Sequence, residues 1–380
     1  MMVMDGKKVF MLLTNPFKPD PRVYKEAKTL IELGFDVTVV AWDRERNHKL
    51  FEIVEGVRVC RIPIASKYAS FFDFFIKLPL FYLKAVLYVV KNKDGLYAIH
   101  ANDFDTAPLA FFLSRLLGVK FIYDIHDLYH SRISLLREKK TLNFLQRLIL
   151  SLEIIHAKLA DSVITVTRSL GGRHKGVKEF LVNRGVVPDK VYVVWNTPEL
   201  EFFPLIKRER GEKFTVGYIG TIRSVSSFIP LFEVARRDRR LKLLFVGSGA
   251  SKGKIANLLT ERYPNVDVEF IDEVPYHNVF KYYTLCDAVY SMYPPTDNIK
   301  RALAVKMFES IVMGIPVIVN RDTLMEDFVV LYRCGVSSNL STEDMANALE
   351  KIIKVKPPSR LRDKWNWDRN RSTLRRVYCE

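Results

Sequence analysis

The sequence predicts an α/β protein of two doubly wound parallel-sheet domains joined by a short linker. Its 380 residues are too many for one ordinary domain and fit two. Short apolar runs alternate with helical patterns in two successive series, and a segment with proline and a charge run separates the series. Strands that alternate with helices form parallel sheets covered on both faces, so both halves should share this architecture.

The first strand–helix–strand unit begins at Lys7. The run KKVFMLLT is typical of a buried strand, and apolar residues over 23–31 then follow helical spacing. Asp20 suits the cap of this helix, Pro21 its first position and Gly34 its end. The run FDVTVVAW resumes as a strand and completes a βαβ unit.

The same alternation continues along the chain. The first series adds GLYAIHAND, VKFIYDI, DSVITVT and KVYVVWN, and the second holds FTVGYIG, LKLLFVGSG, VDVEFI, DAVYSMY and IPVIV. Residues 197–213 lack a clear period, which is typical of a linker. We expect an N-terminal domain over 1–200, a linker over 201–213, a C-terminal domain over 214–358, and a C-terminal helix over 359–380 that packs back on the N-terminal domain.

The net charge of +16 favours polyanionic partners. No zinc-finger spacing, RNA-recognition signature or basic helix followed by heptads occurs, so we expect no nucleic acid among the partners. Phosphorylated small molecules and an anionic membrane surface stay as alternatives. The four cysteines are far apart in sequence and form no CxxC pair, and the N-terminal segment lacks a signal cleavage site. We therefore expect a cytoplasmic protein with reduced thiols.

The most apolar stretch, residues 68–93, does not have the pattern of a spanning helix. Lys77, Pro79 and Lys84 break its apolar runs below the roughly 18 residues that such a helix needs. As a helix it places Asp73, Lys77, Lys84 and Lys91 on one narrow stripe and leaves a wide apolar face. That face must meet either the core or lipid.

Strings throughout the chain resemble the family-four retaining glycosyltransferases of the GT-B fold, the glycosyl transferases group 1 type. They include DPRVYKEAKTLIELGFDVTVV, IHANDFDTAPLA, FIYDIHDLYH, VGYIGTI, LLFVGSG and KMFESIVMGIPVIV. The resemblance implies two Rossmann-like domains facing across a cleft, with the acceptor in the N-terminal domain and a nucleotide-diphosphate sugar in the C-terminal one. It also implies transfer to an acceptor hydroxyl with retained configuration, without a cofactor or an obligatory metal.

Lys306 and Glu309 lie three positions apart on a predicted helix, so their side chains should be neighbours. A surface ion pair is the alternative interpretation. The helix follows a strand and the loop MYPPTDNIK, and a helix N-terminus with an ammonium can neutralise a departing diphosphate. By resemblance, Glu309 binds the donor ribose. The family often has a second glutamate eight positions earlier, where this chain has Arg301, a phosphate clamp or the mark of a subfamily.

Two loops of the second half are further candidates for the donor site. Many relatives place an arginine directly after the glycine of the first strand, whereas this chain has Gly220, Thr221 and then Arg223. Arg223 is expected to replace that phosphate contact, with an exposed loop arginine as the alternative. Gly247, Ser248 and Gly249 would let backbone N–H groups approach phosphate or sugar, although glycines also serve plain turns.

His126 ends a predicted strand and, by resemblance, faces the donor sugar and phosphates. A neutral imidazole there could hydrogen-bond a sugar hydroxyl, and a structural histidine is the alternative. Asp127 is a weaker candidate, because such a carboxylate is commonly a cap. The set His100, Asp103, Asp105, His126 and His130 could also be metal ligands. We nevertheless expect no metal site, because the DFD string suits a helix start.

We expect a front-face reaction in which the leaving phosphate accepts the acceptor proton, since no convincing nucleophile is present. The Phe-rich stretch and the basic segments LLREKK and RHKGVK favour a lipid-linked acceptor, with another glycan as the alternative, and a peripheral place on the inner face of the cell membrane. Two other functions stay open: a sugar-nucleotide epimerase or hydrolase on the same fold, and a catalytically silent binding subunit.

Overall fold

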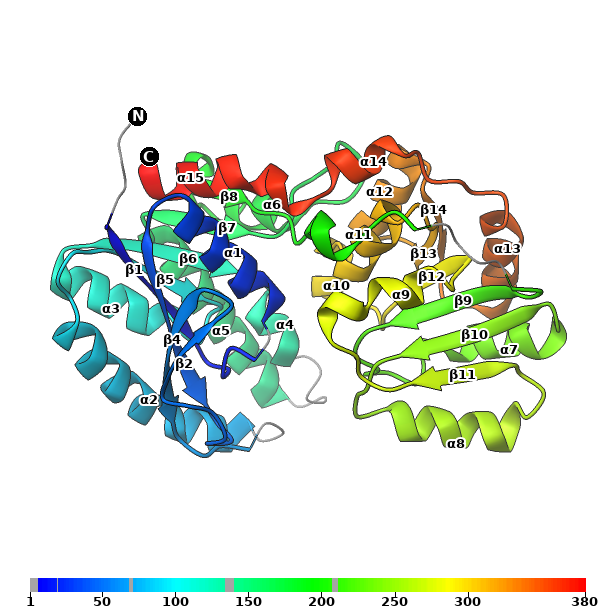
Figure 1. Cartoon of the computed structure of the whole chain (residues 1–380), viewed down its shortest axis with the longest axis horizontal. Helices are drawn as coiled ribbons and strands as arrows, with labels where there is room; N and C mark the ends of the chain where they lie inside the picture. Colours follow the sequence, from blue (N-terminus) through cyan, green and yellow to red (C-terminus); the bar gives the residue numbers. More distant parts are fainter. Residues whose placement is uncertain (1–5, 19, 68–70, 134–139, 207–210) are drawn as a thin grey trace. The chain divides into compact units, whose positions relative to one another are not determined.

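The computed structural model describes residues 6–18, 20–67, 71–133, 140–206 and 211–380. The chain forms two compact units (Figure 1). Unit 1 comprises Met1–Val166, Val177–Val194 and Asn370–Glu380, and unit 2 comprises Thr167–Gly176 and Trp195–Arg369. The units differ from the expected domains at 167–176, 195–200 and 359–369, which all belong to unit 2. Two helices and a 3-10 turn replace the single helix expected over 359–380, and only its last part belongs to unit 1. The basic segment LLREKK lies mostly outside the described residues.

Unit 1 contains an eight-stranded sheet in the order β3-β4-β2-β1-β5-β6-β7-β8. All neighbouring pairs are parallel except β3 with β4, which are antiparallel. The strands are β1 (Lys8–Leu13), β2 (Asp36–Asp43), β3 (Phe51–Val54), β4 (Val57–Pro63), β5 (Leu96–Asn102), β6 (Lys120–Ile125), β7 (Ser162–Thr165) and β8 (Val191–Val193). The hairpin of β3 and β4 was not among the predicted elements.

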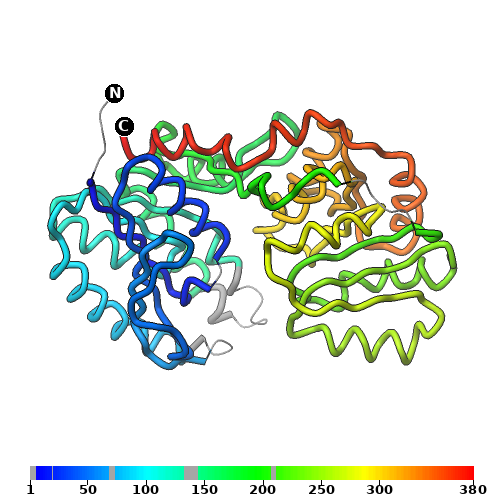
Figure 2. Tube along the Cα trace, in the orientation of Figure 1, coloured from blue at the N-terminus to red at the C-terminus, as the bar shows by residue number. Residues whose placement is uncertain are grey.

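Helices cover the sheet of unit 1. They are α1 (Pro21–Glu32), α2 (Phe71–Lys91), α3 (Ala107–Leu117), α4 (Tyr129–Ile133), α5 (Lys140–Leu159), α6 (Val177–Val182), the 3-10 turn η2 (Pro188–Lys190) and α15 (Arg371–Cys379). Helix α1 begins as predicted, because Asp20 caps it by accepting from the N–H of Val23. Figure 2 shows the C-terminal segment running beside α1, where Arg371 pairs with Glu32.

Unit 2 contains a six-stranded parallel sheet in the order β11-β10-β9-β12-β13-β14. Its strands are β9 (Phe214–Ile219), β10 (Leu241–Val246), β11 (Val268–Ile271), β12 (Ala288–Ser291), β13 (Val317–Asn320) and β14 (Gly335–Ser338). Two doubly wound sheets confirm the predicted fold class.

Two groups of helices cover the sheet of unit 2. One core contains α7 (Ile229–Arg237), α8 (Lys252–Arg262) and α13 (Thr342–Ile352), and the other contains α9 (Phe280–Tyr283), α11 (Val305–Val312), α12 (Leu324–Tyr332) and α14 (Arg360–Lys364). The remaining elements are α10 (Asp297–Arg301) and the 3-10 turns η3 (Leu200–Phe202), η4 (Tyr276–Asn278) and η5 (Trp367–Asn370). The helix predicted directly after the loop MYPPTDNIK begins only at Val305, so its expected start at Arg301 is wrong. Arg301 ends α10 and its carbonyl accepts from the hydroxyl of Thr167 at 2.8 Å.

Candidate functional site

The loops that follow β9 and β10 join at the carboxyl edge of the second sheet. The two strands are neighbours, so Gly220 and Gly247 leave the sheet side by side. The N–H of Gly220 donates to the carbonyl of Val246, and the N–H of Ile222 donates to that of Ser248, each at 2.8 Å. These bonds hold the two glycine-containing loops together, at the edge where open α/β sheets bind ligands.

The glycines of these loops are required by close backbone approach. Gly247 and Gly249 have φ of 128° and 150°. A Cβ on Gly247 would lie 2.5 Å from the carbonyl oxygen of Gly220, and one on Gly249 would lie 2.3 Å from that of Ile222. Gly220, with φ of 127°, would instead direct a Cβ to 3.4 Å from Nζ of Lys306. The structure therefore brings together Gly220 and Lys306 as neighbours.

Lys306 lies in the first turn of α11 and is only 8% exposed. Its Nζ lies 3.2 Å from the centroid of the Tyr218 ring and 5.6 Å from that of Tyr293. Burial lowers the pKa of Lys306 well below its usual value, and the charge of Arg223 lowers it further, while Glu309 opposes the shift. An anion that binds beside this lysine would raise its pKa, because the anion stabilises the charged form that burial disfavours.

Glu309 lies one turn further along α11 and is 5% exposed. Its Oε2 accepts the hydroxyl of Tyr283 at 2.6 Å. Burial and the charge of Glu309 together raise the pKa values of Tyr276 and Tyr283 well above the usual range. Because both Lys306 and Glu309 are buried, the alternative of a surface ion pair is wrong.

The other predicted residues of this site have different surroundings. Arg223 is exposed, and its carbonyl accepts from Ser251 at 2.9 Å. The hydroxyl of Ser248 donates to Glu273 at 3.1 Å. Arg301 makes an ion pair with Asp297 at 3.4 Å and donates to the carbonyl of Lys175 at 3.5 Å. Arg301 thus lies on α10 with partners of its own, and a contact with a donor stays a prediction.

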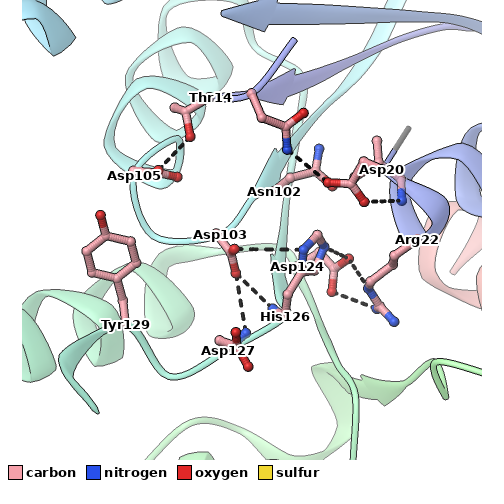
Figure 3. A network of polar contacts seen from close by, with 12 residues as sticks. Thr14, Asp20, Arg22, Asn102, Asp103, Asp105, Asp124, His126, Asp127 and Tyr129 are labelled. Carbon is pink, nitrogen blue, oxygen red and sulfur yellow. Dashed lines mark hydrogen bonds and ion pairs between the residues drawn. The ribbon is translucent and has the colours of Figure 1, made fainter. Parts of the chain in front are cut away.

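In unit 1, His126 follows β6 and is held by two carboxylates (Figure 3). Its Nε2 lies 2.8 Å from Oδ2 of Asp124, and its backbone N–H donates to Oδ1 of Asp103 at 3.0 Å. Asp103 also accepts from the N–H of Asp127 at 3.4 Å and has φ of 66°, which is uncommon for a residue with a side chain. This strained turn fixes the backbone at His126.

Asp124 is fully buried and links His126 to α1. Arg22 donates to both of its carboxylate oxygens, at 3.1 Å and 2.9 Å. Burial opposes ionisation of Asp124, but the charges of Arg22 and His126 hold its pKa well below the usual range. Burial alone would lower the pKa of His126, yet Asp124 and Asp103 raise it to about 10. The two carboxylates beside His126 thus favour the protonated imidazole over the neutral form named in the sequence analysis.

The network extends to Glu26, His100 and the C-terminal helix. Arg22 lies 3.0 Å from Glu26, whose pKa burial raises to about 8. Nδ1 of His100 lies 2.5 Å from the hydroxyl of Tyr378 on α15. Burial lowers the pKa of His100, which disfavours the charged form of this imidazole. Charge is thus concentrated on Arg22, Asp124 and His126.

The alternative metal set does not act as one group. His130 pairs with Glu153 at 2.9 Å, and Asp105 accepts from Thr14 at 2.6 Å. Figure 3 shows the contact of Asp105 with Thr14 apart from the contact of Asp103 with His126. Asp105 and His130 thus each have a protein partner of their own, and the absence of a metal site stays a prediction.

Sequence reasoning missed the partners that surround the predicted residues. In unit 1 these are Arg22, Glu26 and Asp124, and in unit 2 they are Tyr218 and Tyr283. One signal was present, since Arg22 and Glu26 share a helix face with buried apolar residues at i, i+4 spacing. The tyrosines carry no local pattern, because they come from β9 and α9 and meet α11 only in the fold.

Comparison with known proteins agrees with the architecture. Residues 22–202 match the profile described as Glycosyltransferase Family 4, and residues 201–366 match that of Glycosyl transferases group 1. This chain belongs to the family-four, group 1 glycosyltransferases. Among curated proteins, no sequence matches it. The family resemblance read from the sequence is thereby confirmed, and the glycosyltransferase is of GT-B type.

Solved structures with the same fold cover nearly the whole glycosyltransferase chain. Sucrose-phosphate synthase from Thermosynechococcus elongatus superposes with a TM-score of 0.77 at 17% identity, over 98% of each chain. HepE of Anabaena, in complex with UDP-glucose, gives 0.67 at 12% identity over 97% of this chain and 98% of its own. A candidate UDP-N-acetylglucosamine 2-epimerase from Listeria monocytogenes gives 0.58 at 12% identity over 97% and 94%. At these identities the likeness concerns the fold.

Proposed function

We propose that this glycosyltransferase moves a sugar from a nucleotide-diphosphate donor to an acceptor hydroxyl with retained anomeric configuration. The observation that carries the proposal is the convergence of Lys306, Gly220 and the Gly247–Gly249 turn at the carboxyl edge of the second sheet. A buried lysine beside glycines and a helix N-terminus suits a diphosphate. The complex of the structurally similar HepE with UDP-glucose supports a donor of this class.

In the proposed reaction the acceptor oxygen attacks the anomeric carbon on the face from which the phosphate leaves. The carbon–oxygen bond to the diphosphate breaks, and the acceptor proton passes to the departing phosphate oxygen. Lys306, Arg223 and the first turn of α11 stabilise the charge that develops on that oxygen. Glu309 is proposed to bind the ribose, and protonated His126 to donate a hydrogen bond to the reacting groups. No metal or cofactor takes part in this scheme.

We further propose a lipid-linked or other glycan acceptor and a peripheral location on the inner face of the cell membrane. The net charge of +16 and the apolar surface of α2 support it. No helix within the described part of the chain is long and apolar enough to span a membrane.

The donor site can be tested by thermal shift and turnover with UDP-, GDP- and ADP-sugars in the presence of a chelator. Wild type should be stabilised by one class of nucleotide, and Lys306→Ala and Glu309→Ala should lose that shift. Lys351→Ala removes an exposed lysine on α13 and serves as the matched control. A wild type that no nucleotide stabilises, or whose activity the chelator abolishes, would contradict the proposal. Donor consumption without an added acceptor would favour an epimerase or hydrolase, and binding without consumption a silent subunit.

A further inference from the structure

Three helices of unit 1 share one face of its sheet. Phe81 of α2, Leu113 of α3 and Ala157 of α5 all belong to one hydrophobic core. Phe75 of α2 and Ile149 of α5 also pack around Phe104, just before α3. Helices α2, α3 and α5 therefore form one layer over the sheet, and each has a side directed away from it.

The outward side of α2 is apolar along most of its length. The exposed fractions are 60% for Ile76, 44% for Leu80, 58% for Leu83, 63% for Leu87 and 36% for Val90. Their spacing of four and three residues makes a continuous stripe. Leu78, Phe81, Ala85 and Val89 are buried on the opposite side. One side of α2 therefore packs against the core, and the opposite side is exposed.

The neighbouring helices extend this apolar surface. On α3, Phe112 and Leu116 are 54% and 57% exposed. On α5 the exposed residues are Phe144, Leu148, Ile155 and Leu159. At 100° per residue these side chains point opposite to the buried residues of their own helices. We call the exposed apolar residues of α2, α3 and α5 the outer apolar face, and contiguous surfaces of this kind mark interaction sites.

Charge distinguishes among the partners that could cover the outer apolar face. Lys84, Lys91, Arg147 and Lys158 are exposed along its edges. Among the described side chains of the three helices, the only acids are Asp73 and Glu153. Asp73 pairs with Lys77 at 2.7 Å, and Glu153 is buried against His130. A second copy of this chain would bring the same cations against each other, whereas anionic headgroups would neutralise them.

We propose that the outer apolar face inserts into the surface of an anionic lipid bilayer, with Leu83 and Leu87 among its deepest residues and the lysines at headgroup level. An apolar stripe bordered by cations is the pattern of an interfacial helix. The inference rests on the peripheral location proposed above and names the surface that binds. Its test needs no turnover, so it can fail while the proposed sugar transfer from a nucleotide donor stands.

The test is flotation of the full chain with phosphatidylcholine vesicles that contain phosphatidylglycerol, compared with pure phosphatidylcholine. Wild type should float with the anionic vesicles, and the Leu83→Glu, Leu87→Glu double variant should bind at least about tenfold more weakly, since two apolar contacts become charged. The matched control is Val330→Glu with Leu331→Glu, which alters two exposed apolar residues of α12 in unit 2. This control should float like wild type.

Folding and nucleotide binding are monitored by circular dichroism and thermal shift for every variant. Equal flotation of wild type and the α2 variant, or no flotation of wild type at low salt, would overturn the proposal. So would a lipid-free dimer that only the α2 variant dissociates, because a second copy would then cover the face. Loss of flotation with an intact nucleotide shift supports it. Flotation by a chain that binds no nucleotide overturns the proposed function alone.

Discussion

At the residue scale, Lys306 is a buried cation whose charged form the surrounding protein disfavours. Its ammonium lies against the Tyr218 ring and is almost completely buried. Burial and Arg223 disfavour its charged form, and only Glu309 supports it. A bound diphosphate supplies the missing negative charge and raises the pKa, so the lysine should be protonated as the nucleotide binds.

We therefore predict that nucleotide-diphosphate binding takes up protons at mildly alkaline pH. Titration calorimetry in two buffers of different ionisation enthalpy, such as Tris and phosphate, should give binding enthalpies that differ by the proton uptake. Lys306→Met should reduce the uptake, whereas Lys351→Met should not. Equal uptake by wild type and Lys306→Met would assign the proton to another group.

Glu26 provides a second prediction, on the dependence of stability on pH. Its folded pKa is raised from 4.5 to about 8, chiefly by burial. The folded state keeps this proton where the unfolded chain releases it, so the contribution of Glu26 is fully present below 4.5 and is lost as pH rises through 8. Glu26→Gln removes this titration. The melting temperature of Glu26→Gln relative to wild type should rise between pH 5 and pH 8.5.

The control for this experiment is Glu32→Gln, an exposed carboxyl on the same helix that pairs with Arg371. Its difference from wild type should change little over the same interval. A constant difference between Glu26→Gln and wild type would mean that Glu26 is ionised in the fold. The charge of Arg22 would then lower the pKa of Glu26 more than burial raises it.

At the element scale, predictions succeeded where local pattern and tertiary packing agree. Helix α1 has a cap at Asp20, a proline at its start and Gly34 after its end, and it forms where expected. Buried parallel strands such as β9 and β10 are apolar except at Thr215 and Lys242, and they are recognised for that reason. Gly220 and Gly247 directly follow these strands, so the sequence located the two joined loops, and their role in donor binding stays a prediction.

Elements were not predicted where the sequence pattern is short, or where tertiary contacts determine the local structure. The β3–β4 hairpin turns at Glu55 and Gly56, both with positive φ, and this two-residue signal was passed over. The break between α10 and α11 has no proline or glycine to mark it. Thr167, distant in sequence, binds the carbonyl of Arg301 there. The tyrosines around Glu309 were missed for the same reason, because only the fold brings α9 to α11.

At the scale of the whole molecule, the chain returns to unit 1 at its C-terminus. Leu374, Val377 and Tyr378 of α15 are all fully buried there. The hydroxyl of Ser162 donates to the carbonyl of Val377 at 3.1 Å, and Tyr378 contacts His100. A segment of the last ten or so residues thus completes a core built mainly from the N-terminal half.

We predict that shortening side chains of α15 destabilises unit 1 and leaves nucleotide binding by unit 2 intact. Leu374→Ala should lower the free energy of unfolding by about 2–5 kcal/mol, because it leaves a cavity in a closed core. Arg375→Ala alters an exposed residue of the same helix and should change it by less than about 0.5 kcal/mol. Calorimetry should show that unit 1 of Leu374→Ala unfolds at a lower temperature than in wild type. The unfolding temperature of unit 2 should still rise when nucleotide is added. If Leu374→Ala lowered the unfolding temperature and also abolished the shift with nucleotide, α15 would stabilise both units.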